Sequence, residues 1–248
     1  MSVDSQKPWI AQYSVGDLAA SAGIGLTPVG TVMGTAALVP LMGSAPAISM
    51  EVSASSGLAT QGWEKALAQL VKEALTLGAD GVASLRLERR NFTDNVTVYG
   101  FRATGTAVIG LPRKALWMTE CDPNELLVLA RAGFSPIALA FGCCTWHQSS
   151  YGWTQKRGSM GQWLTQEITP ATQAYYTARS VALQRMQAMA TEAGAVGIVG
   201  SRINTLAVSS PGGVSDGFTA GIEAFGTAIA PYPGPPSPPI QTNLSMIP

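Results

Sequence analysis

The sequence predicts an α+β protein made of two tandem repeats, each with one main helix packed on a small, mostly antiparallel sheet. Three blocks of residues occur twice, in the same order, along the 248-residue chain. The middle block has the apolar spacing of an amphipathic helix in its first copy. After each copy of it, a short apolar run leads into turn residues and a further apolar run, which is typical of a β-hairpin.

The first block leads into the first strand of each repeat. Residues 17–34 read DLAASAGIGLTPVGTVMG and residues 125–142 read ELLVLARAGFSPIALAFG, with the acid, the Leu, the Pro and the final Gly in register. Because the second copy continues directly into residues 143–147, we place that segment on the first strand of the second repeat.

The second block predicts the main helix of each repeat. It spans residues 63–86 in the first copy and 179–202 in the second. Gly78 and Gly194 lie where a left-handed C-cap is expected after each helix. The apolar positions of the first copy follow the i, i+3, i+4, i+7, i+8 spacing and form the predicted core face, namely Leu67, Leu70, Val71, Ala74 and Leu75.

A β-hairpin is predicted after each helix. Residues 82–87 and 198–203 are short apolar runs, and each leads into turn residues. The third block then supplies the closing strand, reading ATGTAVIG up to Gly110 and AFGTAIAP up to Pro231. Each repeat is therefore expected to run strand, long excursion, helix, strand, strand.

These blocks divide the chain into four parts. We predict repeat 1 at residues 1–112, a linker at 113–123, repeat 2 at 124–231 and a Pro-rich flexible tail at 232–248. With about 110 residues, each repeat is long enough to bury a core of its own.

The tail has the composition of a polyproline II segment rather than of a helix or sheet. It ends in a small apolar patch of Leu244, Met246 and Ile247. Two interpretations stay open. The patch docks into an apolar groove on a protein partner or a neighbouring subunit, or the tail is a solvated end without a role.

The composition bears on the partners. Lys plus Arg and Asp plus Glu both number 15, so no net charge draws the chain onto nucleic acid. Hydrophobic residues make up 46% and charged residues 12%, which indicates that apolar surface is buried between subunits. We therefore expect a homo-oligomer that binds no nucleic acid.

The cysteines and the N-terminus favour the cytoplasm. The three cysteines include an adjacent pair and do not form a disulfide framework. Asp4 and Lys7 precede any apolar stretch, unlike the start of a secretory signal. The uncharged stretch at 18–50 has the length of a membrane span, but its prolines and glycines would break a helix repeatedly. We expect a cytoplasmic protein with no membrane partner.

The blocks resemble a known family. A helix running into GADGVASLR at residues 78–86, followed by a hairpin ending in GTAV at 105–108, resembles the YbjQ family of small bacterial domains labelled as heavy-metal-binding. The second copy is less similar, because Val196 replaces the acid at Asp80. The resemblance implies an α+β domain that assembles into homo-oligomeric rings, often pentameric, and it supplies no catalytic residue.

Cys143, Cys144 and His147 are the candidate metal site. Thiolates and imidazoles bind zinc or copper, and we predict no other cofactor. On an extended strand the two cysteines point to opposite faces, and His147 lies about 13 Å from Cys143 at roughly 3.3 Å per residue. Two alternatives stay open: a metal held by several subunits, and cysteines that pack as small hydrophobes beside a partly exposed histidine.

The residues favour a protein that is not an enzyme. His147 is the only histidine, and the sequence contains no G-x-S-x-G nucleophile elbow. It also lacks the G-x-x-x-x-G-K-[ST] phosphate loop.

Aromatic and arginine residues are the candidate contacts to other subunits or partners. Tyr151, Trp153 and Trp163 lie in the excursion of the second repeat, where subunit contact, packing within the domain and ligand stacking are all open. Arg86 and Arg202 recur at one place in both repeats. Each could pair with an acid across a domain interface or lie on the solvent face.

Together these observations favour a non-enzymatic, ring-forming homo-oligomer, with five chains preferred, that acts as a structural or scaffold protein with a partner-docking tail. The alternative is a protein that binds a metal ion or a small ligand.

Overall fold

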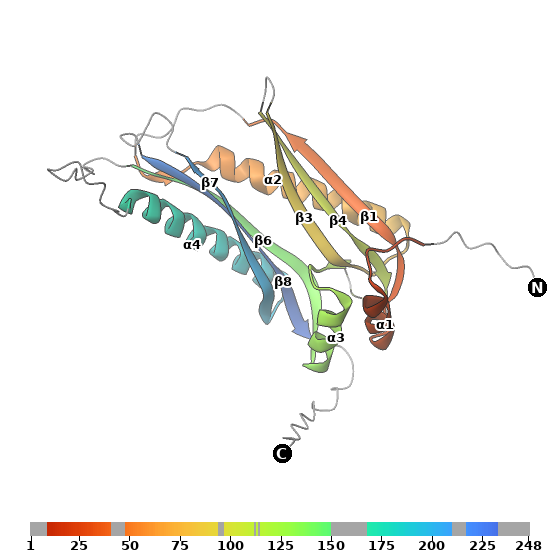
Figure 1. Ribbon diagram of the computed structural model, residues 1–248. Helices are drawn as coiled ribbons and strands as arrows, with labels where there is room; N and C mark the ends of the chain where they lie inside the picture. Colours follow the sequence, from red (N-terminus) through yellow and green to blue (C-terminus); the bar gives the residue numbers. More distant parts are fainter. Residues whose placement is uncertain are drawn as a thin grey trace, which may run out of the picture.

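The computed structural model describes residues 9–40, 48–93, 97–111, 113, 115–149, 168–209 and 217–232. In this part of the chain, four helices accompany two four-stranded sheets (Figure 1). The α+β class predicted from the sequence is confirmed.

The first half of the chain builds one sheet and two helices. The first sheet has the strand order β1-β4-β3-β5, and its long strands are antiparallel. The elements in chain order are α1 (Val15–Gly23), β1 (Thr27–Leu38), β2 (Met50–Glu51), α2 (Ser53–Thr76), β3 (Gly81–Thr93), β4 (Thr97–Ile109) and β5 (Trp117–Met118).

The second half follows a similar course. The second sheet has the order β2-β6-β8-β7, so the short strand β2 of the first half completes the sheet of the second. The remaining elements are α3 (Pro123–Arg131), β6 (Phe134–Gln148), α4 (Thr169–Glu192), β7 (Gly197–Ser209) and β8 (Phe218–Pro231).

The two main helices match in detail. Both α2 and α4 have 24 residues, and the residues preceding them, Val52 and Ile168, have nearly equal backbone angles. Gly78 and Gly194 follow the helices with φ of +70° and +76°, so the predicted left-handed C-caps are confirmed. The predicted duplication of one domain stays a prediction, which these matched geometries support.

A glycine allows each main helix to cross the first long strand of its half at close range. A Cβ on Gly34 of β1 would lie 1.9 Å from the carbonyl oxygen of Ala66 on α2. A Cβ on Gly142 of β6 would lie 2.1 Å from the carbonyl oxygen of Ala182 on α4. No side chain fits between strand and helix at either position.

Strands β3 and β7 carry the same irregularity. Ser84 has φ of 53° and Gly200 has φ of 61°, both in the left-handed region. The pairing of β3 with β4 shifts around Ser84, and that of β7 with β8 shifts around Gly200. Each of these strands therefore has a bulge near its start.

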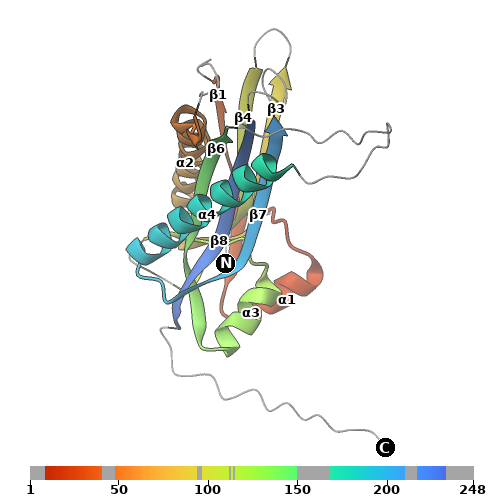
Figure 2. The same ribbon diagram turned by 90° about the vertical axis from the view of Figure 1, so that its left-hand side faces the viewer.

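The two halves share the core cluster around α2. Helix α2 packs on β1 and β4 of the first sheet and on β6 of the second, so it lies between the sheets (Figure 1), while α4 covers the other face of the second sheet (Figure 2). The Trp63 indole of α2 contacts Phe101 edge-on at 5.1 Å and Phe225 of the second sheet at 5.3 Å. The core around α2 therefore takes residues from both halves, while the second half has a further core cluster of its own against α4.

This double contact changes the buried face of α2. The prediction placed Leu75 on the core face, but its side chain is 58% exposed. The buried positions extend instead toward the start of the helix and around to a second side, through Ser56, Ala59, Trp63 and Ala66. A helix between two sheets buries a wider arc than the single stripe that the spacing predicts.

Two short helices precede the long strands and were not predicted. Helix α1 begins with a capping box between Ser14 and Asp17, and α3 with one between Asp122 and Glu125. The S-x-x-D and D-x-x-E patterns were readable in the sequence.

Within the predicted linker, residues 113–123, the described residues 115–123 form a packed segment. Its β5 pairs in parallel with β3, and Trp117 is fully buried. The indole Nε1 of Trp117 donates a hydrogen bond to the Leu111 carbonyl at 3.1 Å. The segment thus fixes the second half against the first.

Within the described residues, no helix has the length and apolar character needed to span a membrane.

Candidate functional site

Two of the three predicted metal ligands lie back to back on β6. Cys143 packs with α2 in the core between the sheets, whereas Cys144 packs with α4 on the opposite face. Both thiols are buried and form no disulfide. Alternation along the strand separates them.

His147 is fully buried, so the expectation of a partly exposed strand-end histidine is wrong. The reason is that β6 is paired on both sides at this point, with Met50 of β2 and Thr219 of β8. The His147 Nδ1 lies 3.0 Å from the Thr219 hydroxyl oxygen. Its Nε2 is buried and has no hydrogen-bond partner among the described residues.

The protonation of the thiols opposes metal binding within one chain. Burial, reinforced by the Glu223 carboxylate, raises the pKa of Cys143 well above its usual range. Burial, reinforced by Glu51, raises the pKa of Cys144 to about 11. Metal ligation requires thiolates. No group of three His, Cys, Asp or Glu side chains in the described ranges is placed to hold an ion.

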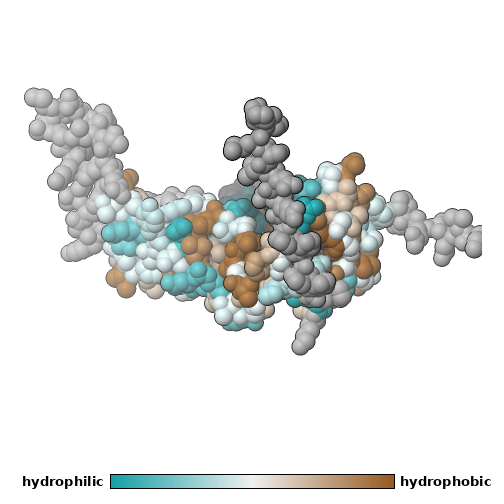
Figure 3. All heavy atoms as spheres, turned by 90° about the horizontal axis from the view of Figure 1, so that it is seen from below, coloured by the Kyte–Doolittle hydropathy of each residue, from teal (hydrophilic) through white to brown (hydrophobic). Residues whose placement is uncertain are grey.

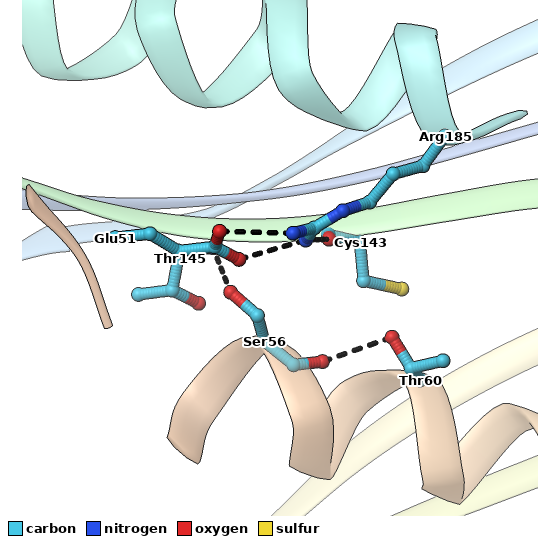
Figure 4. A network of polar contacts seen from close by, with 6 residues as sticks. All are labelled: Glu51, Ser56, Thr60, Cys143, Thr145 and Arg185. Carbon is cyan, nitrogen blue, oxygen red and sulfur yellow. Dashed lines mark hydrogen bonds and ion pairs between the residues drawn. The ribbon is translucent and has the colours of Figure 1, made fainter. Parts of the chain in front are cut away.

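A polar network joins the two halves beside β6 (Figure 4). Arg185 extends from α4 and donates to both carboxylate oxygens of Glu51 at 2.7 and 2.9 Å, and to the Cys143 carbonyl at 2.6 Å. The backbone N–H of Thr145 donates to the Ser56 hydroxyl at 2.8 Å. Hydrogen bonding from Arg185 lowers the pKa of Glu51. The network ties β2 and α2 to β6 and α4.

A second ion pair lies between the sheets. The Arg89 guanidinium of β3 donates to the Glu223 carboxylate of β8 at 2.7 Å. The same guanidinium stacks over the Tyr99 ring at 4.5 Å. These charged groups connect the two halves of the chain.

A cavity of about 360 Å³ opens between the halves beside this pair. Arg89, Asn91 and Tyr99 line it from the first half, and Thr145 and Thr219 from the second. Polar and apolar groups line it in similar proportion, so it is a place where a small ligand would be considered.

The two predicted arginines occupy different surroundings. Arg202 donates to Glu120 of the linker segment at 2.6 Å and stacks over Phe225 at 5.1 Å. Arg86, at the matching position of β3, is exposed. Two interpretations were open for these arginines. Arg202 pairs with an acid, whereas Arg86 lies on the solvent face.

The other predicted contact residues, Tyr151, Trp153 and Trp163, lie outside the described residues, as do Leu244, Met246 and Ile247 of the tail.

One face of the first sheet has exposed residues on β1 that were not predicted. Along β1, Val32 and Gly34 face α2, whereas Met33 and Thr35 point to the opposite side and are exposed, Met33 by 52%. The matching residues of the second sheet are Phe141 and Cys143, which are buried against the first half. Phe141 and Cys143 are therefore covered in the second half, whereas Met33 and Thr35 at the matching positions of the first half are open.

A second apolar surface lies at the end of the molecule formed by α1 and α3. Seen from that end, apolar side chains gather near the middle of the surface (Figure 3). Val15 and Leu18 of α1 and Val128 of α3 are exposed there. A groove of about 450 Å³ lies beside α3, and Val199 and Gly200 of β7 line its other side.

No family model matches the chain, so the resemblance to the YbjQ family stays a prediction. The chain is similar to an encapsulin nanocompartment protein of Mycobacterium tuberculosis. The two sequences are 28% identical over 205 residues, which cover 79% of this chain and 78% of the encapsulin nanocompartment protein. The similarity thus extends over most of both chains.

Proposed function

We propose that this protein is a non-enzymatic structural component that assembles with further copies of itself. The observation that carries the proposal is the unequal covering of the two sheets. In the second sheet, Phe141 and Phe225 pack against the first half. In the first sheet, residues 10–12 lie over Thr31 and Thr106 of the corresponding face, whereas Met33 and Thr35 farther along β1 are exposed. A second copy would bury Met33 on this face, beside the Glu88–Arg102 ion pair that lies on the same side of the sheet.

The similarity to a protein named for an encapsulin nanocompartment supports the same proposal, because a compartment is an assembly. The charged side chains near the predicted metal site also support it. Arg185, Glu51, Arg89 and Glu223 are all engaged in contacts between the two halves. Their arrangement serves structure rather than the positioning of a substrate.

The finer form of the proposal is a closed ring. A contact between two different faces of the same chain generates a ring if the rotation closes. The resemblance to the YbjQ family favours five chains. The tail, residues 232–248, would add a docking segment through Leu244, Met246 and Ile247.

Native mass spectrometry of the full chain tests the proposal. We expect a single species at a multiple of the chain mass, and five chains if the ring is of the proposed kind. A monodisperse monomer at micromolar concentration would contradict self-assembly. A variant that ends at residue 232 tests the tail, because an unchanged assembly state and unchanged partner binding would leave the tail without the proposed role.

A second candidate function, binding of a metal ion or small ligand, rests on the Nε2 of buried His147, which has no hydrogen-bond partner in the described part of the chain. Zinc titration of the assembled protein by calorimetry tests it, with the Cys143→Ser/His147→Ala variant as control. Heat from the parent alone would support a metal site. Equal heats from both proteins would exclude one at these residues.

A further inference from the structure

Strand β5 shows how one half of the chain attaches to the other. The Thr119 N–H donates to the Val82 carbonyl at 3.0 Å, and the Leu85 N–H donates to the Thr119 carbonyl at 2.9 Å. These bonds add the segment to the edge of β3 around its bulge. The Trp117 ring lies 2.1 Å from where a Cβ of Gly81 would be, so Gly81 must lack a side chain.

The same pattern of residues occurs before α1. Residues 9–14 read WIAQYS and residues 117–122 read WMTECD. Trp9 precedes the capping residue Ser14 by five positions, just as Trp117 precedes Asp122. Trp117 is fully buried, whereas Trp9 is 50% exposed and Ile10 is 75% exposed. Residues 9–14 thus have the same sequence pattern as the segment that forms β5, but they pair with no strand among the described residues.

Strand β7 has the matching edge free. It pairs with β8 on one side and with no strand on the other among the described residues. Gly197 begins β7 as Gly81 begins β3, and each lies three positions before the left-handed bulge residue. A Cβ on Gly197 would meet only Ile229, at an ordinary 3.7 Å. Nothing within the described chain requires a glycine at 197.

The surface beside this edge is suited to receive a segment. The groove of about 450 Å³ next to α3 is lined by Val128, Leu129, Val199 and Gly200, and most of its lining is apolar. On β3, the corresponding space at the bulge is occupied by the linker, since the Ser84 N–H donates to the Cys121 carbonyl at 3.0 Å. The groove therefore continues the free edge of β7.

Trp9 cannot reach the β7 edge of its own chain. The Gln12 N–H donates to the Thr106 hydroxyl at 3.1 Å, and the Thr31 hydroxyl donates to the Ile10 carbonyl at 2.9 Å. These bonds hold the segment on the first sheet, beside β1, whereas β7 lies at the edge of the second sheet (Figure 1). A second copy must supply the edge.

We propose that residues 9–12 of one copy add as a parallel strand to the free edge of β7 in a second copy, with the Trp9 indole over Gly197. The inference rests on the self-assembly proposed above and names its interface. The α4 helix of the second copy then covers Met33 and Thr35 on the first sheet, as α2 covers Phe141 and Cys143 within the chain. The contact joins two different surfaces, so it forms rings or filaments.

Two variants that each remove one side of the contact test the proposal. Trp9→Ala removes the inserted indole. Gly197→Val places a side chain where the indole would lie, in a strand that favours valine and has room for it. We expect both variants to keep the circular dichroism spectrum and melting temperature of a folded chain and to be monomeric by native mass spectrometry. Leu75→Ala, at an exposed position of α2, is the control and should assemble like the parent.

Mixing the two variants makes the test specific. Trp9→Ala keeps the β7 edge and Gly197→Val keeps Trp9, so an equimolar mixture should form a one-to-one dimer and no larger species. Variants that assemble like the parent, or a mixture that stays monomeric, would overturn this interface. If Gly197→Val does not fold, parent-like assembly of Trp9→Ala alone overturns it. A parent protein that is itself monomeric would instead overturn the proposed self-assembly.

Discussion

Arg89 and Glu223 form an ion pair across the two halves of the chain, with only 13% and 1% of their side chains exposed. The pair is thus nearly withdrawn from water, and removing one partner would leave a buried charge without compensation. We expect Arg89→Met to lower the free energy of unfolding by about 3–5 kcal/mol. Replacing both residues, as in Arg89→Met/Glu223→Leu, should recover most of this loss in urea denaturation. A loss in the single variant as small as that of a surface residue would contradict the prediction.

The pair between Glu51 and Arg185 predicts a dependence of stability on pH. The pKa of Glu51 is lowered in the folded chain, chiefly by hydrogen bonding from Arg185. A depressed carboxyl pKa contributes stability above the unfolded pKa, and this contribution is lost as the pH falls through the folded pKa. We expect Glu51→Gln to cost about 0.5–1 kcal/mol at neutral pH, since the pair is partly exposed.

The difference between parent and Glu51→Gln should therefore shrink in urea titrations below the ordinary pKa range of glutamate. Glu64→Gln, at an exposed position of α2, is the matched control and should stay within about 0.5 kcal/mol of the parent at both pH values. A constant difference for Glu51→Gln across the titration would show that the pKa of Glu51 is not lowered.

The crossing of β1 and α2 predicts opposite effects of alanine at two glycines. Gly34→Ala would place a Cβ 1.9 Å from a backbone oxygen, so the helix must move away, at a cost of about 1–3 kcal/mol. Gly57→Ala adds a Cβ with no atom within 4 Å, inside α2, and should gain about 0.5–1 kcal/mol. Thermal unfolding of both variants measures the two changes in stability. Equal changes would argue against the close crossing of β1 and α2.

The three thiols should be unreactive in the folded chain. Burial is the main cause that raises the pKa of Cys121, Cys143 and Cys144. A thiol reagent needs both access and thiolate. We expect Ellman's reagent at pH 8 to label no cysteine of the native protein and three after denaturation in guanidinium. Rapid labelling of Cys143 or Cys144 in the native protein would show that β6 opens.

Much of the fold could be predicted from local sequence patterns. The glycine caps at Gly78 and Gly194 and the strands after them depend on neighbouring residues, so the sequence reveals them. The buried face of α2 depends on packing against a distant sheet, so the spacing of Leu67 to Leu75 misled the assignment of Leu75. The capping boxes at Ser14 and Asp122 are also local patterns, so the sequence does indicate where α1 and α3 begin.

The candidate site was less predictable than the fold. Alternation along an extended strand correctly separated Cys143 from Cys144. The burial of His147 could not be inferred, because it depends on pairing with β2, which lies nearly a hundred residues earlier in the chain. The exposure of Met33 and Thr35 on the first sheet could not be inferred either. It is recognised only when the matching faces of the two sheets are compared in three dimensions.

The place of α2 between the sheets has a consequence for synthesis. While the ribosome is making the first half, the Trp63 indole and β2 have no second sheet to contact, since β6 and β8 are translated later. The nascent first half therefore leaves the exit tunnel with apolar surface open until about residue 225 has emerged. Chaperones that bind exposed apolar segments should associate with this intermediate and leave once β8 is complete.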